Sequence, residues 1–213
     1  MGTIKQGILG GFSGKVGTVV GASWKGISYM RGQAQHVKNP RTAAQLYNRA
    51  ALRAITDALR PIATTLQITF AKSACKMSAF NKAVQINYKK AIINQDGQPV
   101  VDYSKLVLSK GNIKPFSTLF IEDMDHNGDY LLSTIEDPTC PFIYEGLIFF
   151  IYDVADATWY SGVVIEQYEA GDTLECTGVP LLRNKEYLAF ACAYDPATGQ
   201  VSNPIARVGI LSD

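Results

Sequence analysis

Glycine is concentrated at the start of the chain, and this constrains the fold there more than any other feature. Nine of the 18 glycines lie within the first 32 of 213 residues. Residues 15–24 are rich in β-branched side chains, residues 27–31 can form a returning strand, and Gly26 suits the turn between them. The sequence therefore predicts a two-stranded ribbon within a Gly-rich basic arm, residues 1–38.

Two glycines, Gly17 and Gly21, are expected inside the strands of this ribbon. Glycine in a strand costs roughly 0.5–1 kcal/mol relative to alanine, so the close approach of another backbone is the expected reason for both.

An isolated ribbon of this kind is marginally stable in water, so we expect it to finish folding against another surface. Its cations can seek an acidic surface, and its aromatic side chains can anchor the contact, because aromatic residues and arginine dominate interface energetics. The alternative is that the ribbon folds back on its own chain and the aromatic residues are core. The expected assembly interface consists of Lys15, Trp24, Lys25, Tyr29 and Arg31.

Residues 39–94 have the apolar periodicity of two or three helices. Asn39 and Pro40 are the expected cap and first turn of the first helix. Pro61 should end or bend it and begin a second helix, and Ser78 should cap a third. The outer face of the first helix is predicted to be basic, with Arg41, Arg49 and Arg53.

From residue 101 onward, short apolar runs recur at intervals of roughly 8–14 residues with turn residues between them, a pattern typical of an antiparallel sandwich. A run over residues 104–110 is expected to be a strand, and residues 94–99, NQDGQP, are interpreted as the linker that precedes the sandwich. In residues 186–195, larger side chains alternate with smaller ones, and the larger set should face the core. We therefore predict an α+β fold that ends in an immunoglobulin- or fibronectin-III-like β-sandwich, residues 101–213.

Charge divides the chain near its midpoint. Residues 1–100 hold 14 basic and 2 acidic residues, a balance of +12, whereas residues 101–213 hold 6 basic and 17 acidic residues, a balance of −11. This asymmetry predicts an acidic partner for the first half, whether a protein or nucleic acid, unless two solvated surfaces merely differ in charge. The expected acidic acceptors surround two turns of the second half: Glu122, Asp123, Asp125, Asp129, Glu166, Glu169 and Asp172.

Sequence motifs for catalysis are absent, so we expect no enzyme activity and no cofactor. SGKVG, residues 13–17, lacks both the first glycine and the hydroxyl of a phosphate-binding loop. DMDHNGD, residues 123–129, opens like a calcium loop, but Thr134 stands where a bidentate glutamate is required. Asn127 and Gly128 favour a hairpin turn there, which leaves weak calcium binding open.

The cysteines are far apart, form no C-x-x-C pair, and are expected to be buried free thiols: Cys75, Cys140, Cys176 and Cys192. No apolar run approaches the ~20 residues of a membrane helix, and the first residues lack a secretory signal. We therefore expect synthesis in the cytoplasm and no membrane partner.

Residues 7–32, GILGGFSGKVGTVVGASWKGISYMRG, and residues 39–52, NPRTAAQLYNRAAL, resemble an uncharacterised family that is abundant in Bacteroidota genomes and their phages. The shared pattern is S-G-K-V-G, then W-K-G, an arginine, and N-P-x-T-x-A-Q, and it covers about the first 55 residues. The resemblance implies a virion structural protein of a tailed phage, such as a crAss-like phage that infects Bacteroides. It would belong to the tail, the tail hub or the head–tail connector, and its partners would be copies of itself in a ring and other virion proteins.

Two other functions stay open. A DNA-binding or packaging accessory would contact phosphates through the basic side chains of the first half, namely Lys15, Lys25, Arg31, Arg41, Arg49 and Arg53. A module that binds surface glycans would need an exposed aromatic cluster, for which Trp159 and Tyr160 are the candidates.

Overall fold

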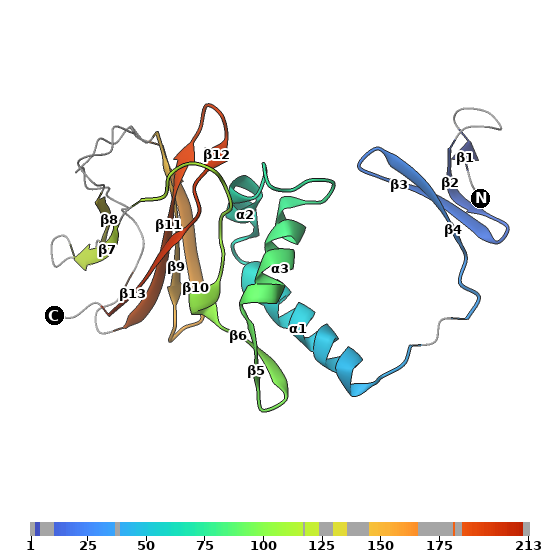
Figure 1. Ribbon diagram of the computed structural model, residues 1–213, viewed down its shortest axis with the longest axis horizontal. Coiled ribbons are helices and arrows are strands. Elements are labelled where there is room, and N and C mark those ends of the chain that lie inside the picture. Colours follow the sequence, from blue (N-terminus) through green and yellow to red (C-terminus); the bar gives the residue numbers. More distant parts are fainter. Residues whose placement is uncertain are drawn as a thin grey trace. The chain divides into compact units, whose positions relative to one another are not determined.

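The described part of the chain combines helices with antiparallel sheets, as the sequence predicts (Figure 1). The chain separates into two compact units, Met1–Gln45 and Leu46–Asp213. The computed structural model describes residues 3–4, 11–36, 39–116, 118–123, 130–135, 145–165, 181 and 185–210.

The first unit contains an antiparallel sheet in the order β1-β2-β3-β4, with strands Thr3–Ile4, Phe12–Val16, Val19–Trp24 and Ile27–Gly32. The prediction of a two-stranded ribbon is therefore wrong, because the first predicted strand is divided at a turn. Gly17 begins that turn with a φ of +58°, which glycine adopts without steric cost.

The second turn of this sheet lies where the sequence predicts it, at Gly26. Lys25 and Gly26 have φ values of 46° and 81°, and positive values at both central residues are characteristic of a type I′ hairpin turn. This turn fixes which residues of β3 and β4 are paired.

Helix α1, Ala43–Leu59, begins later than the sequence predicts. Asn39 and Pro40 precede the helix rather than starting it, so the predicted cap is wrong. Thr42 stands directly before the first helical residue, and threonine is also favoured at the cap position.

The breaks between the helices follow the predicted signals. Helix α1 ends just before Pro61, and α2 covers Ala63–Thr69. Helix α3 covers Ala79–Lys90, and its predicted cap is confirmed, because Ser78 Oγ accepts a hydrogen bond from the Asn81 N–H at 3.2 Å.

Residues 94–99 are not a linker but the centre of a β-hairpin. Strands β5, Ile92–Gln95, and β6, Gln98–Val101, are paired antiparallel. Asp96 and Gly97 have φ values of 52° and 80°, which indicates a second type I′ turn. Asp-Gly between apolar runs is itself a hairpin signal, and it explains the difference from the prediction.

The second unit is built around a sheet in which β11 is the central strand. The strand order is β10-β9-β11-β12, β13 also pairs with β11, and all pairings are antiparallel. A separate antiparallel hairpin consists of β7 and β8. The strands are β7 Thr118–Asp123, β8 Tyr130–Ile135, β9 Leu147–Asp153, β10 Thr158–Val164, β11 Glu186–Asp195, β12 Gln200–Val201 and β13 Ile205–Ile210.

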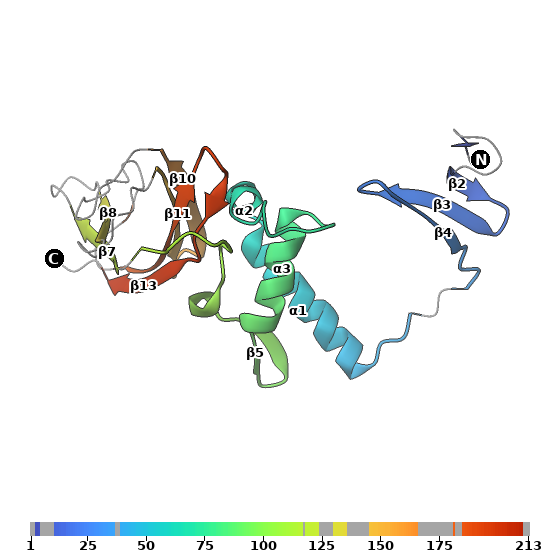
Figure 2. The same ribbon diagram turned by 45° about the horizontal axis from the view of Figure 1, so that its top comes forward.

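Both faces of the central strand are buried, which corrects the expectation of a single core-facing side. Leu188, Phe190 and Cys192 pack against the helices, whereas the smaller alternate residues pack with Phe116 and Leu119 on the opposite face. Figure 2 shows helices α1–α3 on one side of the sheet and the β7–β8 hairpin on the other. The helices and the sheet therefore share one core.

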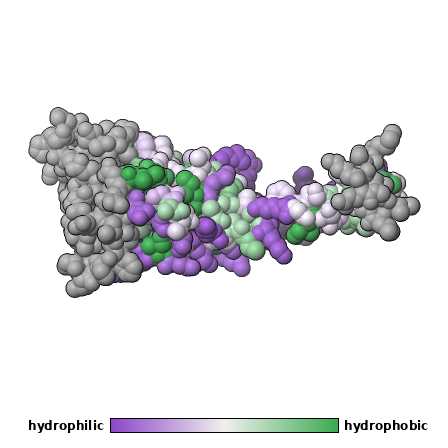
Figure 3. Space-filling model, turned by 90° about the horizontal axis from the view of Figure 1, so that it is seen from above, coloured by the Kyte–Doolittle hydropathy of each residue, from purple (hydrophilic) through white to green (hydrophobic). Residues whose placement is uncertain are grey.

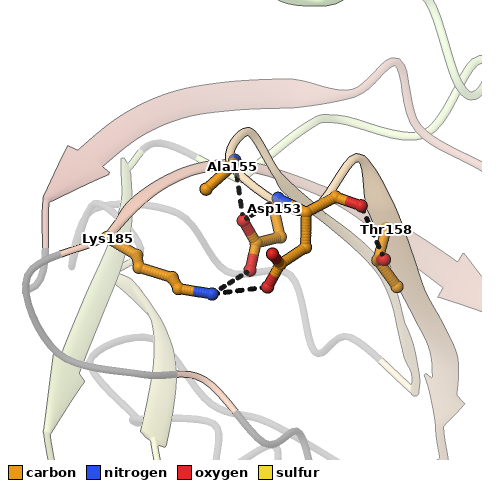
Figure 4. Close-up of polar contacts among 5 residues, drawn as sticks. Asp153, Ala155, Thr158 and Lys185 are labelled. Atoms are coloured by element: carbon orange, nitrogen blue, oxygen red, sulfur yellow. Dashed lines mark hydrogen bonds and ion pairs between the residues drawn. The ribbon is translucent and has the colours of Figure 1, made fainter.

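The turn between β9 and β10 is ordered by a buried carboxylate. Asp153 Oδ1 accepts hydrogen bonds from the N–H groups of Ala155 at 2.9 Å and Asp156 at 3.1 Å. Lys185 Nζ lies 3.5 Å from Asp153 Oδ2 and 2.5 Å from Asp156 Oδ2 (Figure 4). Hydrogen bonding to Asp156 raises the pKa of Lys185, so this cation holds the turn against the start of β11.

The predicted strand over residues 104–110 is absent. The 3-10 helix η1, Tyr103–Lys105, is followed by an extended segment. Within the described residues, side chains supply much of the hydrogen bonding of its backbone. Asn87 Oδ1 accepts from the Val107 N–H at 2.7 Å, and Asn87 Nδ2 donates to the Val107 carbonyl at 2.8 Å. The Asn87 carboxamide therefore pairs with this segment as a neighbouring strand would.

Further contacts hold the same segment between the helices and the sheet. Thr69 Oγ1 donates to the Leu108 carbonyl at 2.7 Å, and Ser109 Oγ donates to the Ser202 carbonyl at 2.7 Å. A Cβ added at Gly111 would lie 1.6 Å from the Val201 carbonyl oxygen, so only glycine fits there.

We predict that Asn87→Ala lowers the free energy of unfolding of the protein by about 3 kcal/mol, because both polar groups of Val107 lose their partner. Asn48→Ala is the matched control, since Asn48 accepts only an exposed hydrogen bond from Tyr88 at 3.1 Å. This control should change stability by less than about 0.5 kcal/mol. Urea denaturation followed by circular dichroism measures both, and equal effects would contradict the assigned role of Asn87.

Candidate assembly interface on the N-terminal ribbon

Strands β2, β3 and β4 are called the ribbon below. Their pairing gathers predicted interface residues on one face of the first unit. Trp24 is paired with Ile27, and Val20 is paired with both Lys15 and Arg31. Paired residues in an antiparallel sheet project to the same side, and every second residue follows them. The ribbon face is therefore formed by Lys15, Val20, Ala22, Trp24, Ile27, Tyr29 and Arg31.

Large apolar side chains on the ribbon face are open to solvent. The exposed fractions are 55% for Trp24, 49% for Ile27 and 47% for Tyr29. Figure 3 shows hydrophobic residues at the surface of the ribbon beside hydrophilic ones. Exposed apolar side chains that lie together, rather than singly, mark interaction surfaces.

The ribbon face contains four of the five predicted interface residues and adds one large exposed apolar residue that the sequence analysis missed. Lys25 lies in the turn rather than on the face. The added residue is Ile27. The predicted turn at Gly26 could have identified it, because a type I′ turn there places Ile27 directly opposite Trp24.

The opposite face of the sheet explains Gly21. A Cβ there would lie 2.2 Å from the Phe12 carbonyl oxygen and 2.7 Å from the Phe12 ring. The predicted close approach of a backbone is confirmed at this position, whereas at Gly17 a Cβ would meet nothing within 4 Å. This opposite face also exposes apolar side chains, with Met30 70% exposed.

The predicted basic residues of α1 are exposed but partly neutralised. Arg53 Nε lies 3.5 Å from Asp57 Oδ2, and Arg60 lies 3.9 Å from the same carboxylate. Together with Arg49, these side chains line a shallow surface hollow of about 420 Å³. Arg41 precedes the helix and is exposed. Because exposed ion pairs contribute only ~0–1 kcal/mol, this surface retains most of its ability to contact anions.

The acidic acceptor candidates fall mostly outside the described residues. Glu122 and Asp123 end strand β7. The other five, Asp125, Asp129, Glu166, Glu169 and Asp172, lie outside the described residues.

The expected aromatic pair for glycan binding is not an exposed cluster. Trp159 and Tyr160 are neighbours in β10 and face opposite sides of the sheet. The Trp159 ring packs 4.9 Å from the Tyr152 ring, which stacks on Tyr103 at 4.1 Å. Burial raises the pKa of Tyr152 above the ordinary range, consistent with a structural cluster.

The prediction of buried cysteines is confirmed at one described position and wrong at another. Cys192 is buried as predicted, and burial raises the pKa of its thiol to about 12. Cys75 is exposed, which corrects the prediction, because it follows α2 in an irregular surface segment. Cys140 and Cys176 lie outside the described residues.

The described part of the chain shows neither a metal-binding cluster nor a membrane-spanning helix. It contains no group of three or more His, Cys, Asp or Glu side chains arranged to hold a metal ion. None of its helices combines the length and the apolar character that crossing a bilayer requires.

The described residues define a mixed protein of helices and antiparallel sheets with an exposed aromatic and basic ribbon face. A family model described as "Family of unknown function (DUF6266)" matches residues 11–125, more than half of the chain, and the chain belongs to this family. No curated protein matches the chain. A solved structure described as "Structure of FN3tt mut" is 20% identical with a TM-score of 0.28, over 46% of this chain and 94% of that chain.

We predict that Gly21→Ala disrupts pairing of β2 with β3, because the added methyl group has no space beneath Phe12. The expected loss of stability of this sheet is about 1–3 kcal/mol, the usual cost of overpacking. Gly32→Ala is the control, since a Cβ there would meet nothing within 4 Å. Amide hydrogen exchange of residues 12–32 should accelerate in the first variant alone, and unchanged exchange would refute the assigned role of Gly21.

Proposed function

We propose that this protein is a structural subunit of a tailed bacteriophage virion, in the tail, the tail hub or the head–tail connector. The observation that carries the proposal is the ribbon face, where Trp24, Tyr29 and Arg31 lie together with exposed aromatic rings. Tryptophan, tyrosine and arginine are the residues most enriched at the energetic centres of protein interfaces. The resemblance of the same segment to a family found in Bacteroidota phages supports the choice of a virion.

The finer fold belongs to the same proposal. We infer that strands β7–β13 form an immunoglobulin- or fibronectin-III-like sandwich, in which the β7–β8 hairpin belongs to the second sheet. The buried cluster that joins Phe116 and Leu119 to one face of β11 supports this arrangement. Helices α1–α3 would then be an addition that covers the outer face of the sandwich.

The partner in this proposal is another copy of the chain, in a ring. The first half carries a balance of +12 and the second half −11, so head-to-tail contact would bring opposite charges together. Exposed ion pairs contribute only ~0–1 kcal/mol each, and therefore mainly steer and align the contact. The aromatic side chains of the ribbon face would supply most of the affinity.

We predict that the double variant Trp24→Ala, Tyr29→Ala weakens self-assembly at least about tenfold, because it removes both aromatic anchors. Met30→Ala is the matched control, since Met30 is an exposed apolar residue of the same strand on the opposite face. Analytical ultracentrifugation over a concentration series measures the effect. Equal assembly of the double variant and the control would exclude the ribbon face as the interface.

Whether the protein is part of the virion is tested separately, by mass spectrometry of purified particles of a phage that encodes the chain. The protein should be present, and a chain without residues 1–32 should remain folded yet be absent from particles. Absence of the intact chain from particles would overturn the virion proposal, and normal incorporation of the shortened chain would overturn the role of the ribbon.

A DNA-binding or packaging accessory is the second candidate. The specific observation in its favour is that Lys15 and Arg31 accompany two exposed aromatic rings on one β-surface. Cations beside aromatic rings on an open sheet are the usual platform for nucleic acid strands.

For this candidate, we predict duplex and single-strand binding that falls by about 0.9 and 0.7 log units per log unit of salt for each neutralised phosphate. The whole chain must be used, because the helices and the sheet share one core. Fluorescence anisotropy at two salt concentrations measures the slope. Lack of binding at low salt removes the candidate.

A further inference from the structure

A cleft of about 520 Å³ is lined by residues of the second unit. The apolar part of its lining, called the floor below, includes Leu106, Val107, Phe190 and Ala206, which come from the extended segment, β11 and β13. The polar part of its lining consists chiefly of Lys89, Lys90 and Lys110. No acidic residue lines it among the described residues.

Among the described residues, the three lysines line the cleft without a carboxylate beside them. Ion pairs of lysine in the described part of the chain involve Lys105 and Lys185, not the lysines of the cleft. Lys89 and Lys90 occupy the last turn of α3, where a cation is favoured by the helix dipole. Lys110 comes from a different segment, so the helix dipole does not explain why all three line one cleft.

The apolar floor continues along strand β13. Ala206 is paired with Phe190 and Val208 with Leu188, so Ala206 and Val208 project to the face of the sheet that the helices cover elsewhere. Val208 is nevertheless 54% exposed. Among the described strands, β13 is paired with β11 alone, so it is an edge strand of this sheet, and Arg207 of β13 donates to the Leu119 carbonyl of β7 at 3.2 Å.

We propose that this cleft and the exposed strip of β13 bind an extended acidic segment of another protein. Side chains of a strand alternate between two sides, so a segment that alternates acidic and apolar residues can direct carboxylates to the lysines and apolar groups to the floor. An edge strand supplies main-chain hydrogen bonds to such a segment. The apolar floor disfavours nucleic acid, which would use the charges but leave the floor uncovered. This site is independent of the proposed virion function.

The test uses the whole protein and a fluorescein-labelled octapeptide of alternating glutamate and leucine. We expect saturable binding by fluorescence anisotropy that is at least about tenfold tighter than for a peptide of alternating glutamate and serine, because only leucine can cover the apolar floor. A DNA duplex should compete only weakly. Equal binding of the serine peptide or the duplex would show a general attraction for anions and would overturn the proposal.

Variants locate the site. Lys90→Glu and Lys110→Glu should each weaken leucine-peptide binding about fivefold or more, because each reverses a charge beside the bound carboxylates. Lys82→Glu is the matched control on the same helix, since Lys82 donates to Gln85 Oε1 at 3.1 Å and does not line the cleft. It should change affinity by less than about twofold. Val208→Ser should weaken binding with no change in charge.

Equal loss of binding in the Lys82→Glu control would overturn the proposal. So would self-association of the protein that the Lys90→Glu variant abolishes, since the occupant would then be a second copy of this chain. Circular dichroism and thermal unfolding of every variant separate lost binding from lost folding.

Discussion

The pairing of the Asn87 carboxamide with Val107 is the contact on which the architecture of the second unit most depends. It joins α3 to a segment that has little strand pairing of its own, through bonds of 2.7 and 2.8 Å. Thr69 and Ser109 extend the same connection toward α2 and the end of the sheet. Because these side chains satisfy the backbone of the segment, it can run between the helices and the sheet and close a core that both contribute to.

The ribbon follows a different principle, because backbone geometry rather than a large core determines its shape. Gly21 allows Phe12 to cover the middle of the sheet, and turns at Gly17 and Gly26 reverse the chain where side chains would otherwise be strained. Phe12 packs over Gly21 on one face, while Trp24 and Tyr29 lie on the other. Gly17, Gly21 and Gly26 are therefore the glycines of this segment that the thin sheet requires.

Local signals allowed part of the structure to be predicted from the sequence. The cap at Ser78, the turn at Gly26 and the alternation along β11 depend on residues close in the chain. The hairpin at Asp96 and Gly97 was also a local signal but was interpreted as a linker. For the candidate interface, residue types indicated Trp24 and Tyr29, whereas Ile27 followed only from strand pairing.

The burial of β11 on both faces could not be predicted from neighbouring residues, since residues distant in sequence cover each side. This burial couples the two layers that pack against the strand. Phe190 contacts the helical layer, while its neighbours Ala189 and Ala191 contact the layer opposite. A larger residue in place of either alanine would push the strand toward the helices, because close-packed interiors transmit strain. Helices and hairpin are therefore expected to evolve together, with compensating volume changes on both sides of one strand.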